Sequence, residues 1–312
     1  MKGIIFIILI QGFLISAGIA QSSQLSVDLP VGYIFSTETT SNLVVEQEFM
    51  GIQYNTQMET GSTIRFQVSS FNGDSAYFLS ASYEKMNIRV TSLLINMEVN
   101  SESIVSGDSL SVLLSLLKGK AFFVKLSKKG EITEVSGLDE MIIETVKSSG
   151  FSEEERYEFT RNLIQSLGTE AILDNYRSNK AFYPEVNVKT TDQWDFEMAL
   201  FKNGIPMKLS SHIRLKELSK NTAILVSEGK ISSDNSQKQT ESSLPPEQLY
   251  YLVGGEVSEI KINTRTGLIR ESIVSQNITG TIKTISAEGS PDVALIPFKI
   301  ISRITMLTNP SK

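Results

Sequence analysis

The sequence predicts an α+β fold that is predominantly β, with two repeated antiparallel curved sheets joined by a helical segment. Three observations predict it: two long stretches of alternating apolar and polar residues, helical periodicity between them, and an internal repeat. The repeat pairs these positions at identical spacing: Leu25, Val27, Tyr33 and Phe35 with Val186, Val188, Trp194 and Phe196; Val68, Phe71, Ala76 and Leu79 with Leu215, Leu218, Ala223 and Val226; Leu113, Gly119, Val124 and Leu126 with Leu249, Gly255, Ile260 and Ile262. Three blocks in the same order indicate duplication of one folding unit.

The chain divides into four segments. They are a signal peptide at 1–20, a first β-rich repeat at 21–136, a helical linker packed on the sheets at 137–180, and a second β-rich repeat at 181–312. The signal peptide is indicated by the positive Lys2, the apolar run Ile4–Ile19 and a small-residue cleavage site ending at Ala20. The alternative is an uncleaved anchor, but a spanning helix needs about 20 apolar residues and Gln11 interrupts this run. We expect cleavage, no membrane span afterwards, and a periplasmic or extracellular location.

Composition excludes several classes of protein. The chain has no cysteine, so disulfides, thiolate chemistry and a lipidated N-terminal cysteine are all excluded, and we expect no lipoprotein. Hydrophobic residues make up 40% of the chain, which is enough for a core that holds the fold without cross-links. The net charge is −6 with no basic cluster, which argues against nucleic acid and anionic membrane surfaces as partners.

The first repeat contains two predicted hairpins and a short helix. Asn72-Gly73-Asp74 separates two apolar or β-branched runs, which is a strong hairpin signal. A second hairpin covers Lys125–Ile132, with Gly130 where a left-handed residue closes the loop. Between them, the leucines of Ser109–Leu117 recur at helical spacing and predict one apolar helix face.

The linker reads as three helices. Leu138–Lys147 has apolar residues at helical spacing, and Ser152 with Glu155 forms a capping box that begins the next helix. That helix ends at Gly168, after which Thr169 is expected to cap a third. Acidic residues at these helix starts suit the positive end of the helix dipole.

Strand patterning returns in the second repeat. Met207–Leu215 alternates apolar and polar residues and predicts a strand with one buried face. Ser232–Ser243 is polar and predicts a loop, and Leu249–Leu252 is expected to form a helical turn. Asn263–Gly267 is the second repeat's counterpart of the Gly130 hairpin.

Few residues carry the chemistry of an active site. His212, the single histidine, lies in a predicted strand on the face opposite Leu209, and without cysteine or a second histidine it has no partner for a zinc site. Asp192 and Asp195 flank Trp194, an arrangement that suits stacking on a sugar; the favoured alternative is that Trp194 matches Tyr33 of the repeat and lies in the core. We therefore name no catalytic or metal-binding residue and no cofactor, and the ligand-binding residues stay unknown.

Several motifs carry a resemblance to a known family. They are Gly119–Ser127, Gly130–Ile132 and Glu134–Asp139; Tyr183-Pro184 with Val188, Asp192 and Trp194; and Ile262 with Arg265-Thr266-Gly267-Leu268. In these motifs the sequence resembles an uncharacterised family of exported bacterial proteins, largely from Bacteroidota, that is catalogued only as a domain of unknown function. The resemblance implies an envelope location and no activity, substrate or site residue. Many members carry a lipidated cysteine, which this chain lacks.

Three functions are consistent with the sequence. The first is an exported cell-envelope protein without enzymatic activity that binds an apolar small molecule or lipid in a groove of the curved sheets. The second is a protein-interaction or scaffolding module that holds an envelope protein partner through a strand edge or sheet face. The least favoured is a carboxylate-dependent hydrolase.

Overall fold

The computed structural model describes residues 22–73, 76–102, 109–202, 205–235, 248–284 and 294–311. The expected signal peptide at 1–20, Asp74 of the first hairpin and residues 236–243 of the expected polar loop lie outside the described residues.

Strands dominate the fold. They are β1 (Ser22–Ser23), β2 (Ile34–Phe49), β3 (Ile52–Asn72), β4 (Ala76–Thr91), β5 (Asn96–Asn100), β6 (Ala121–Ser127), β7 (Ile132–Ser136), β8 (Val188–Lys189), β9 (Gln193–Lys202), β10 (Ile205–Leu218), β11 (Thr222–Ser233), β12 (Gln248–Asn263), β13 (Ile269–Thr284) and β14 (Ala294–Pro310). The helices are α1 (Ser109–Leu117), α2 (Leu138–Lys147), α3 (Glu153–Leu167), α4 (Thr169–Arg177) and the 3₁₀ helix η1 (Ser178–Phe182).

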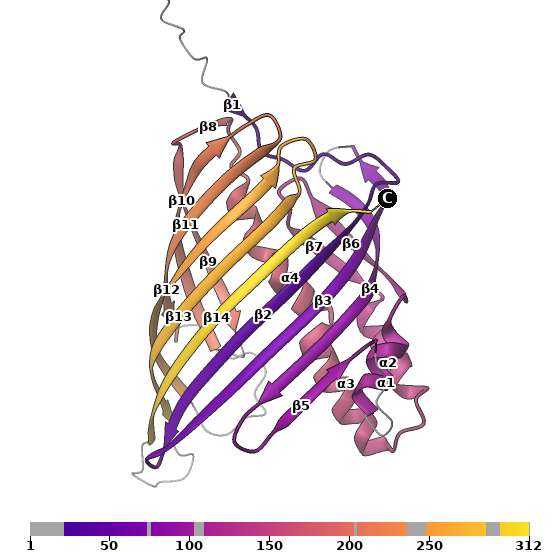
Figure 1. Ribbon diagram of the computed structural model, residues 1–312, viewed down its shortest axis with the longest axis vertical. Helices are drawn as coiled ribbons and strands as arrows, with labels where there is room; N and C mark the ends of the chain where they lie inside the picture. The colour runs from indigo at the N-terminus through magenta and orange to yellow at the C-terminus, as the bar shows by residue number, and fades with distance from the viewer. Residues whose placement is uncertain are drawn as a thin grey trace, which may run out of the picture.

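One 12-stranded antiparallel sheet forms the body of the molecule, in the order β7-β6-β4-β3-β2-β14-β13-β12-β11-β10-β9 with β5 paired to β4. A separate two-stranded sheet pairs β1 with β8. Figure 1 shows the large sheet curving around α4. We call the end that carries β1 and β8 the upper end; the turn between β2 and β3 lies at the lower end.

The expectation of two curved sheets is corrected by the pairing of β2 with β14. These strands are antiparallel neighbours from Phe35 opposite Pro310 to Gln47 opposite Phe298. The strands of both sequence halves therefore share one sheet. Alternation in a sequence shows that a segment is a strand, but it does not show which distant strand it pairs with. The duplication of the sequence stays a prediction.

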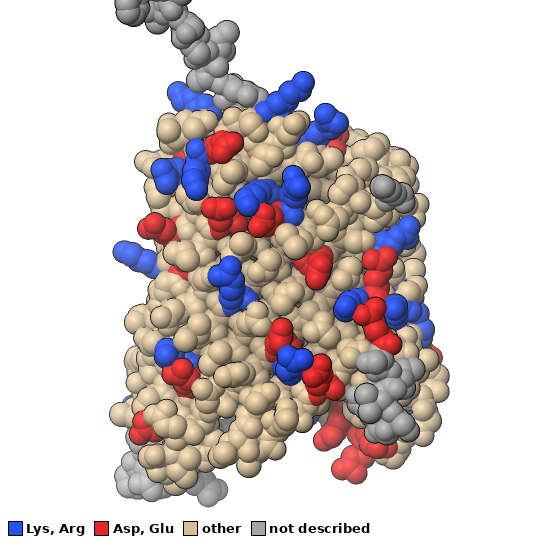
Figure 2. Space-filling view, viewed as in Figure 1, with Lys and Arg blue, Asp and Glu red and all other residues tan. Residues whose placement is uncertain are grey.

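Alternation in β10 shows how each strand divides its residues between the two faces of the sheet. Its residues at positions 207, 209, 211, 213 and 215 are buried, while those at 208, 210, 212 and 214 are exposed. The predicted period-two strand at Met207–Leu215 is thus confirmed. The buried positions lie on the inner, concave face, and the exposed positions lie on the outer face. Figure 2 shows this outer face with Lys, Arg, Asp and Glu mixed over it.

The helical segment packs on the inner face of the sheet and touches both halves of it (Figure 1). The Tyr83 hydroxyl of β4 donates to the Leu167 carbonyl of α3 at 2.8 Å. On the other side, the Trp194 indole of β9 donates to the Ala181 carbonyl of η1 at 2.8 Å. The Tyr183 hydroxyl donates to the Gly267 carbonyl in the turn between β12 and β13 at 2.7 Å. The segment therefore fixes β4 and β9 relative to each other.

Most local predictions for this segment and the hairpins are confirmed. The capping box joins Ser152 and Glu155 at the start of α3, and α1 and α2 have the predicted bounds. Gly130 and Gly267 both have φ of 68° and close hairpin turns. Thr169 is not the cap of α4: Gly168 occupies that position, and the Thr169 backbone N–H donates instead to the Asp139 carboxylate at 2.8 Å.

The expected helical turn at Leu249–Leu252 is wrong. These residues are part of β12 and pair with β13, with Leu249 opposite Lys283 and Leu252 opposite Gly280. A short apolar run fits either a helix or a strand. Here hydrogen bonding to a neighbouring strand decides the conformation.

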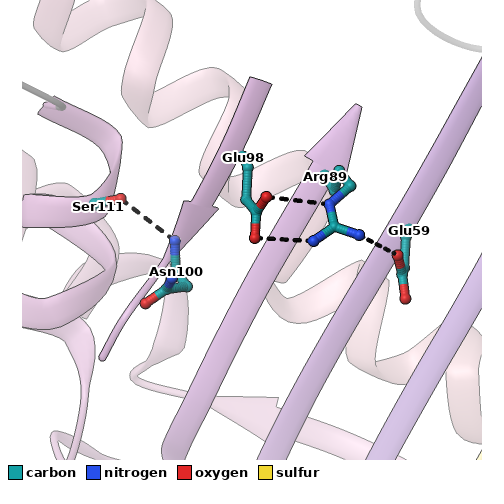
Figure 3. A network of polar contacts seen from close by, with 5 residues as sticks. All are labelled: Glu59, Arg89, Glu98, Asn100 and Ser111. Atoms are coloured by element: carbon teal, nitrogen blue, oxygen red, sulfur yellow. Dashed lines mark hydrogen bonds and ion pairs between the residues drawn. The ribbon is translucent and has the colours of Figure 1, made fainter. Parts of the chain in front are cut away.

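A charged cluster on the outer face attaches the short strand β5 to the sheet (Figure 3). The Arg89 guanidinium of β4 binds Glu98 of β5 through two contacts of 3.0 and 3.2 Å and Glu59 of β3 at 3.4 Å. The Asn100 backbone N–H of β5 donates to the Ser111 hydroxyl of α1 at 3.3 Å. Ion pairing with Arg89 lowers the pKa of Glu98 below its usual value. These contacts set the edge of the sheet and the position of α1.

Candidate functional site

The inner face of the sheet carries two apolar clusters, which we call the upper and the lower cluster. The upper cluster joins strand residues such as Phe66 and Leu225 to helical residues such as Leu163 and Ile172. The lower cluster consists of Ile205, Met207, Leu209, Ile231, Tyr250, Leu252, Ile278, Phe298 and Ile300, with Leu43, Val45, Met198, Leu200 and Ile282 packed against it. Every residue of the lower cluster comes from a strand of the one sheet.

A set of polar side chains, which we call the polar belt, separates the two clusters. It consists of Ser211, Ser227, Glu256, Ser258, Gln276 and Ser302. The Gln276 amide donates to the Glu256 carboxylate at 2.6 Å, and the Ser302 hydroxyl donates to the Gln276 carbonyl oxygen at 3.0 Å. The pairing of β12, β13 and β14 sets these three side chains side by side. The belt thus brings a carboxylate into an otherwise apolar inner face.

Ser258 is the exception within the polar belt. Its side chain is buried, and its hydroxyl oxygen has no hydrogen-bond partner among the described residues. It lies opposite Ser227 of β11 and Val274 of β13, two residues along β12 from Glu256. Leaving a buried hydroxyl unpaired costs about 1–3 kcal/mol. Because this oxygen is buried from solvent, a molecule bound on the inner face would reach it only if neighbouring side chains moved.

A small cavity of about 30 Å³ lies in the upper cluster, between the helical segment and the sheet. Its lining is mostly apolar, and its polar groups are Thr37, Thr308, Asn179 and the tyrosines Tyr176 and Tyr183. The Thr37 and Thr308 hydroxyls lie 3.2 Å apart. A water molecule needs roughly 10–15 Å³ of such space. The cavity therefore has room for about two water molecules.

Burial changes the acidity of the cavity tyrosines. It raises the pKa of Tyr176 to about 12, with a hydrogen bond to Thr37 acting in the opposite direction. Burial also raises the pKa of Tyr183 well above its usual value. Both phenols therefore stay neutral at physiological pH and act as hydrogen-bonding groups.

The residues singled out by their chemistry lie away from the polar belt. His212 is exposed on the outer face, where its Nδ1 contacts Asp195 at 2.7 Å and its Nε2 contacts Gln193 at 3.3 Å. The prediction that His212 lies on the face of its strand opposite to that of Leu209 is confirmed. Trp194 packs against the upper cluster, as the favoured interpretation expects, and Asp192 accepts from the Lys189 backbone N–H at 3.0 Å. The structure does not combine these residues into one site.

Sequence reasoning missed the polar belt. The sequence contained a signal for it: Ser211 and Ser227 each interrupt the apolar and glycine residues at the inward positions of their strands, and Glu256 and Ser258 interrupt the inward positions of β12. A single serine in such a run carries little information. Only the register of β10, β11 and β12 shows that serines at distant positions lie on the same face.

In the part of the chain that the structure describes, no group of three or more His, Asp and Glu side chains could hold a metal ion. No helix within the described ranges is long and apolar enough to cross a membrane.

The model of a family of unknown function (DUF6263) matches residues 74–269. The chain belongs to this family. The match confirms the resemblance to a domain of unknown function, while a bacterial origin and export stay expectations. No curated protein matches the chain.

Solved structures show only distant likenesses to this family member. A structure described as lipid–protein interactions in lipovitellin has a TM-score of 0.47 at 8% identity, over 91% of this chain and 26% of the lipovitellin chain. This chain thus spans about a quarter of the lipovitellin chain. An outer membrane channel from Pseudomonas putida F1 has a TM-score of 0.25 at 9% identity, over 91% and 97% of the two chains. Scores at this level assign neither a fold nor a function.

Proposed function

We propose that this protein is a non-enzymatic carrier that holds an apolar small molecule or lipid against the inner face of its curved sheet. One observation carries the proposal: the lower cluster is built only from strands of one sheet, and half-buried apolar side chains border it at Leu43, Val45, Met198, Leu200 and Ile282. A sheet with an apolar face is stable when a second layer covers that face. The helices provide that layer for the upper cluster. In the lower cluster the side chains of the curved sheet bury one another, and a bound apolar ligand would cover the half-buried side chains at its border.

The inner face also continues beyond the lower cluster onto the first strands of the sheet. Leu43 and Val45 of β2 are half-buried and pack against the lower cluster. Met58 of β3 lies opposite Leu43, and Val90 of β4 lies opposite Met58. These half-buried side chains give a ligand apolar surface to cover, at about 25 cal/mol per Å² of apolar area removed from water.

The polar belt would orient the ligand. Glu256, Gln276 and the unpartnered hydroxyl of Ser258 lie at the boundary of the two clusters. Binding sites for apolar molecules commonly combine an apolar wall with a few polar groups that fix orientation. A ligand with a hydroxyl, carbonyl or amide end would place that end at the belt and its apolar part on the lower cluster.

The cavity beneath α4 and η1 cannot hold such a ligand in the described state. Its volume is about 30 Å³, whereas sites for drug-sized ligands measure roughly 300–1,000 Å³. The proposed binding surface is therefore the lower inner face. The upper cavity is part of the packing between the helical segment and the sheet.

Two neighbouring valines give a matched test. Val45 faces the lower cluster, whereas Val44 precedes it on the same strand and lies on the other face. Both are half-buried. Val45→Arg places a charge on the inner face and should weaken binding of the neutral apolar probe N-phenyl-1-naphthylamine at least about tenfold. Val44→Arg should leave probe binding unchanged, and equal losses in both variants would reject the inner face as the site.

The proposal includes a location for the protein. We propose export by the segment at 1–20 and residence in the periplasm or outside the cell, without a lipid anchor on cysteine.

A scaffolding role is the second candidate function, because β9 is the last strand at one edge of the large sheet. An edge strand offers unpaired backbone groups to a partner's strand. Capture of an envelope protein that depends on the β9 edge would favour this alternative.

A further inference from the structure

Two chain reversals at the lower end of the sheet expose large apolar side chains. The turn between β2 and β3 exposes Phe49, Met50 and Ile52, with Met50 86% exposed. The loop between β4 and β5 exposes Leu93, Leu94 and Ile95, with Leu94 85% exposed. We call these two segments, residues 49–52 and 93–95, the apolar tips. Scattered exposed apolar residues are ordinary, but two consecutive runs at chain reversals are not scattered.

Both apolar tips lie at the same end of the molecule. Strand β3 leaves the first tip, and β4 runs back alongside it until Gln57 lies opposite Thr91, next to the second tip. Figure 1 shows both reversals at the lower end, away from β1 and β8. The sheet itself therefore presents the two tips in one direction.

Met50 in the first tip occupies a position whose backbone conformation favours other residues. Met50 and Gly51 have φ of 52° and 76°, the left-handed pair of a two-residue hairpin turn. Such turns prefer Asn-Gly, because asparagine tolerates positive φ at less cost than an unbranched apolar residue does. Methionine at the apex of this turn therefore has a conformational cost that asparagine would reduce, and formation of the turn does not require an apolar side chain there.

The tips are uncharged. Residues 49–52 and 92–97 contain no Asp, Glu, Lys or Arg. Phe49 lies opposite Ile52, and both occupy inward positions, as Val45 does at the edge of the lower cluster. The exposed Gln47 occupies the inward position between Val45 and Phe49, so the first tip is an apolar patch separate from the lower cluster.

We propose that the apolar tips insert into the surface of a lipid bilayer and dock the lower end of the sheet on it. Apolar side chains that enter the boundary between headgroups and acyl chains strengthen membrane binding in proportion to the apolar area that they bury there. A protein partner is less suited to the tips, since energetic centres of protein interfaces are rich in Trp, Tyr and Arg, which both tips lack. The absence of a basic cluster makes the bilayer contact apolar rather than electrostatic. This inference goes beyond the carrier function, and the observations that support it concern different residues.

The test is flotation of the mature chain, residues 21–312, with vesicles of phosphatidylcholine alone. The wild type should float with the vesicles, and the double variant Met50→Asn/Leu94→Asn should lose at least about tenfold in partition. Asparagine suits the positive φ at position 50, so this variant should fold normally. The matched control is Val186→Asn/Tyr157→Asn, which removes two side chains outside the tips that are each 67% exposed and should float like the wild type.

Several results would overturn the proposal. They are absence of the wild type from the floated fraction, equal flotation of the tip variant, or an equal loss in the control variant. A wild-type dimer that the tip variant dissociates, without vesicle binding, would assign the tips to contact between copies of the chain. Binding of N-phenyl-1-naphthylamine is measured in parallel: the tip variant should keep it, so failure of docking and failure of the carrier function give different results.

Discussion

Two serines of the polar belt differ in their hydrogen bonding, and this difference predicts opposite effects on stability. Ser258→Ala removes a buried hydroxyl that has no partner among the described residues, so it should raise the free energy of unfolding of the ligand-free protein by about 1 kcal/mol. Ser302→Ala removes the donor to Gln276 and should lower it by about 1 kcal/mol. Urea unfolding of both variants measures the effects. Equal destabilisation by both would show that Ser258 is hydrogen-bonded in the folded protein.

Tyr176 makes stability depend on alkaline pH. Its pKa is about 12 in the folded chain against 10.0 for an unperturbed tyrosine. Below pH 10 both states keep the proton. Between pH 10 and 12 the unfolded chain loses it while the folded chain retains it, so the free energy of unfolding should fall as pH rises, by up to about 1.4 kcal/mol per pH unit.

Replacement of Tyr176 by phenylalanine isolates this contribution. The variant should have a shallower fall in stability between pH 10 and 12, measured by urea unfolding at a series of pH values. Tyr157→Phe, which alters an exposed ring on α3, is the control. An unchanged slope in Tyr176→Phe would show that its phenol ionises as readily in the folded chain as in the unfolded one.

Single elements were predictable where the signal is local. The bounds of α1 and α2, the capping box at Ser152 and the glycine turns all follow from side chains within a few residues of each other. The start of β12 could not be predicted, because Leu249–Leu252 fits both helical and strand patterns. Only its pairing with β13 selects the strand. Thr169 shows the same limit at a helix start, since the group that binds its N–H is Asp139, 30 residues away.

The capping box at α3 allows a test at the scale of the element. The Ser152 hydroxyl accepts from the Glu155 N–H at 3.3 Å, and the Glu155 carboxylate accepts from the Ser152 N–H at 2.9 Å. Ser152→Ala should speed amide hydrogen exchange in the first turn of α3, because the Glu155 N–H loses its ordered acceptor. Ser166→Ala, near the other end of this helix, should leave that turn unchanged. Equal exchange in the first turn of both variants would contradict a capping role.

The architecture of the whole molecule was predictable only in part. The dominance of strands, their antiparallel pairing and the helices between them follow from periodicity. The union of all these strands in a single sheet does not follow from periodicity, because it depends on the pairing of β2 with β14, two segments at opposite ends of the sequence. The polar belt depends on the same long-range register. For this reason the sequence indicated an apolar ligand and named no residue that would bind it.

The proposed roles use different parts of the molecule. The helical segment joins both halves of the sheet through Tyr83, Trp194 and Tyr183. The proposals assign ligand binding to the inner face around the lower cluster and bilayer contact to the apolar tips. A carrier with this arrangement would meet the membrane with the end of the sheet that contains the ligand.

Native mass spectrometry of residues 21–312, purified from the cells in which the chain is natively made, is the most direct test of the carrier function. A carrier should show a discrete mass above that of residues 21–312, which is lost on denaturation and is absent from the Val45→Arg variant but present in Val44→Arg. The extra mass would give the chemical class of the ligand. A bare chain mass in the wild type, with no binding of N-phenyl-1-naphthylamine, would contradict a carrier function for the inner face.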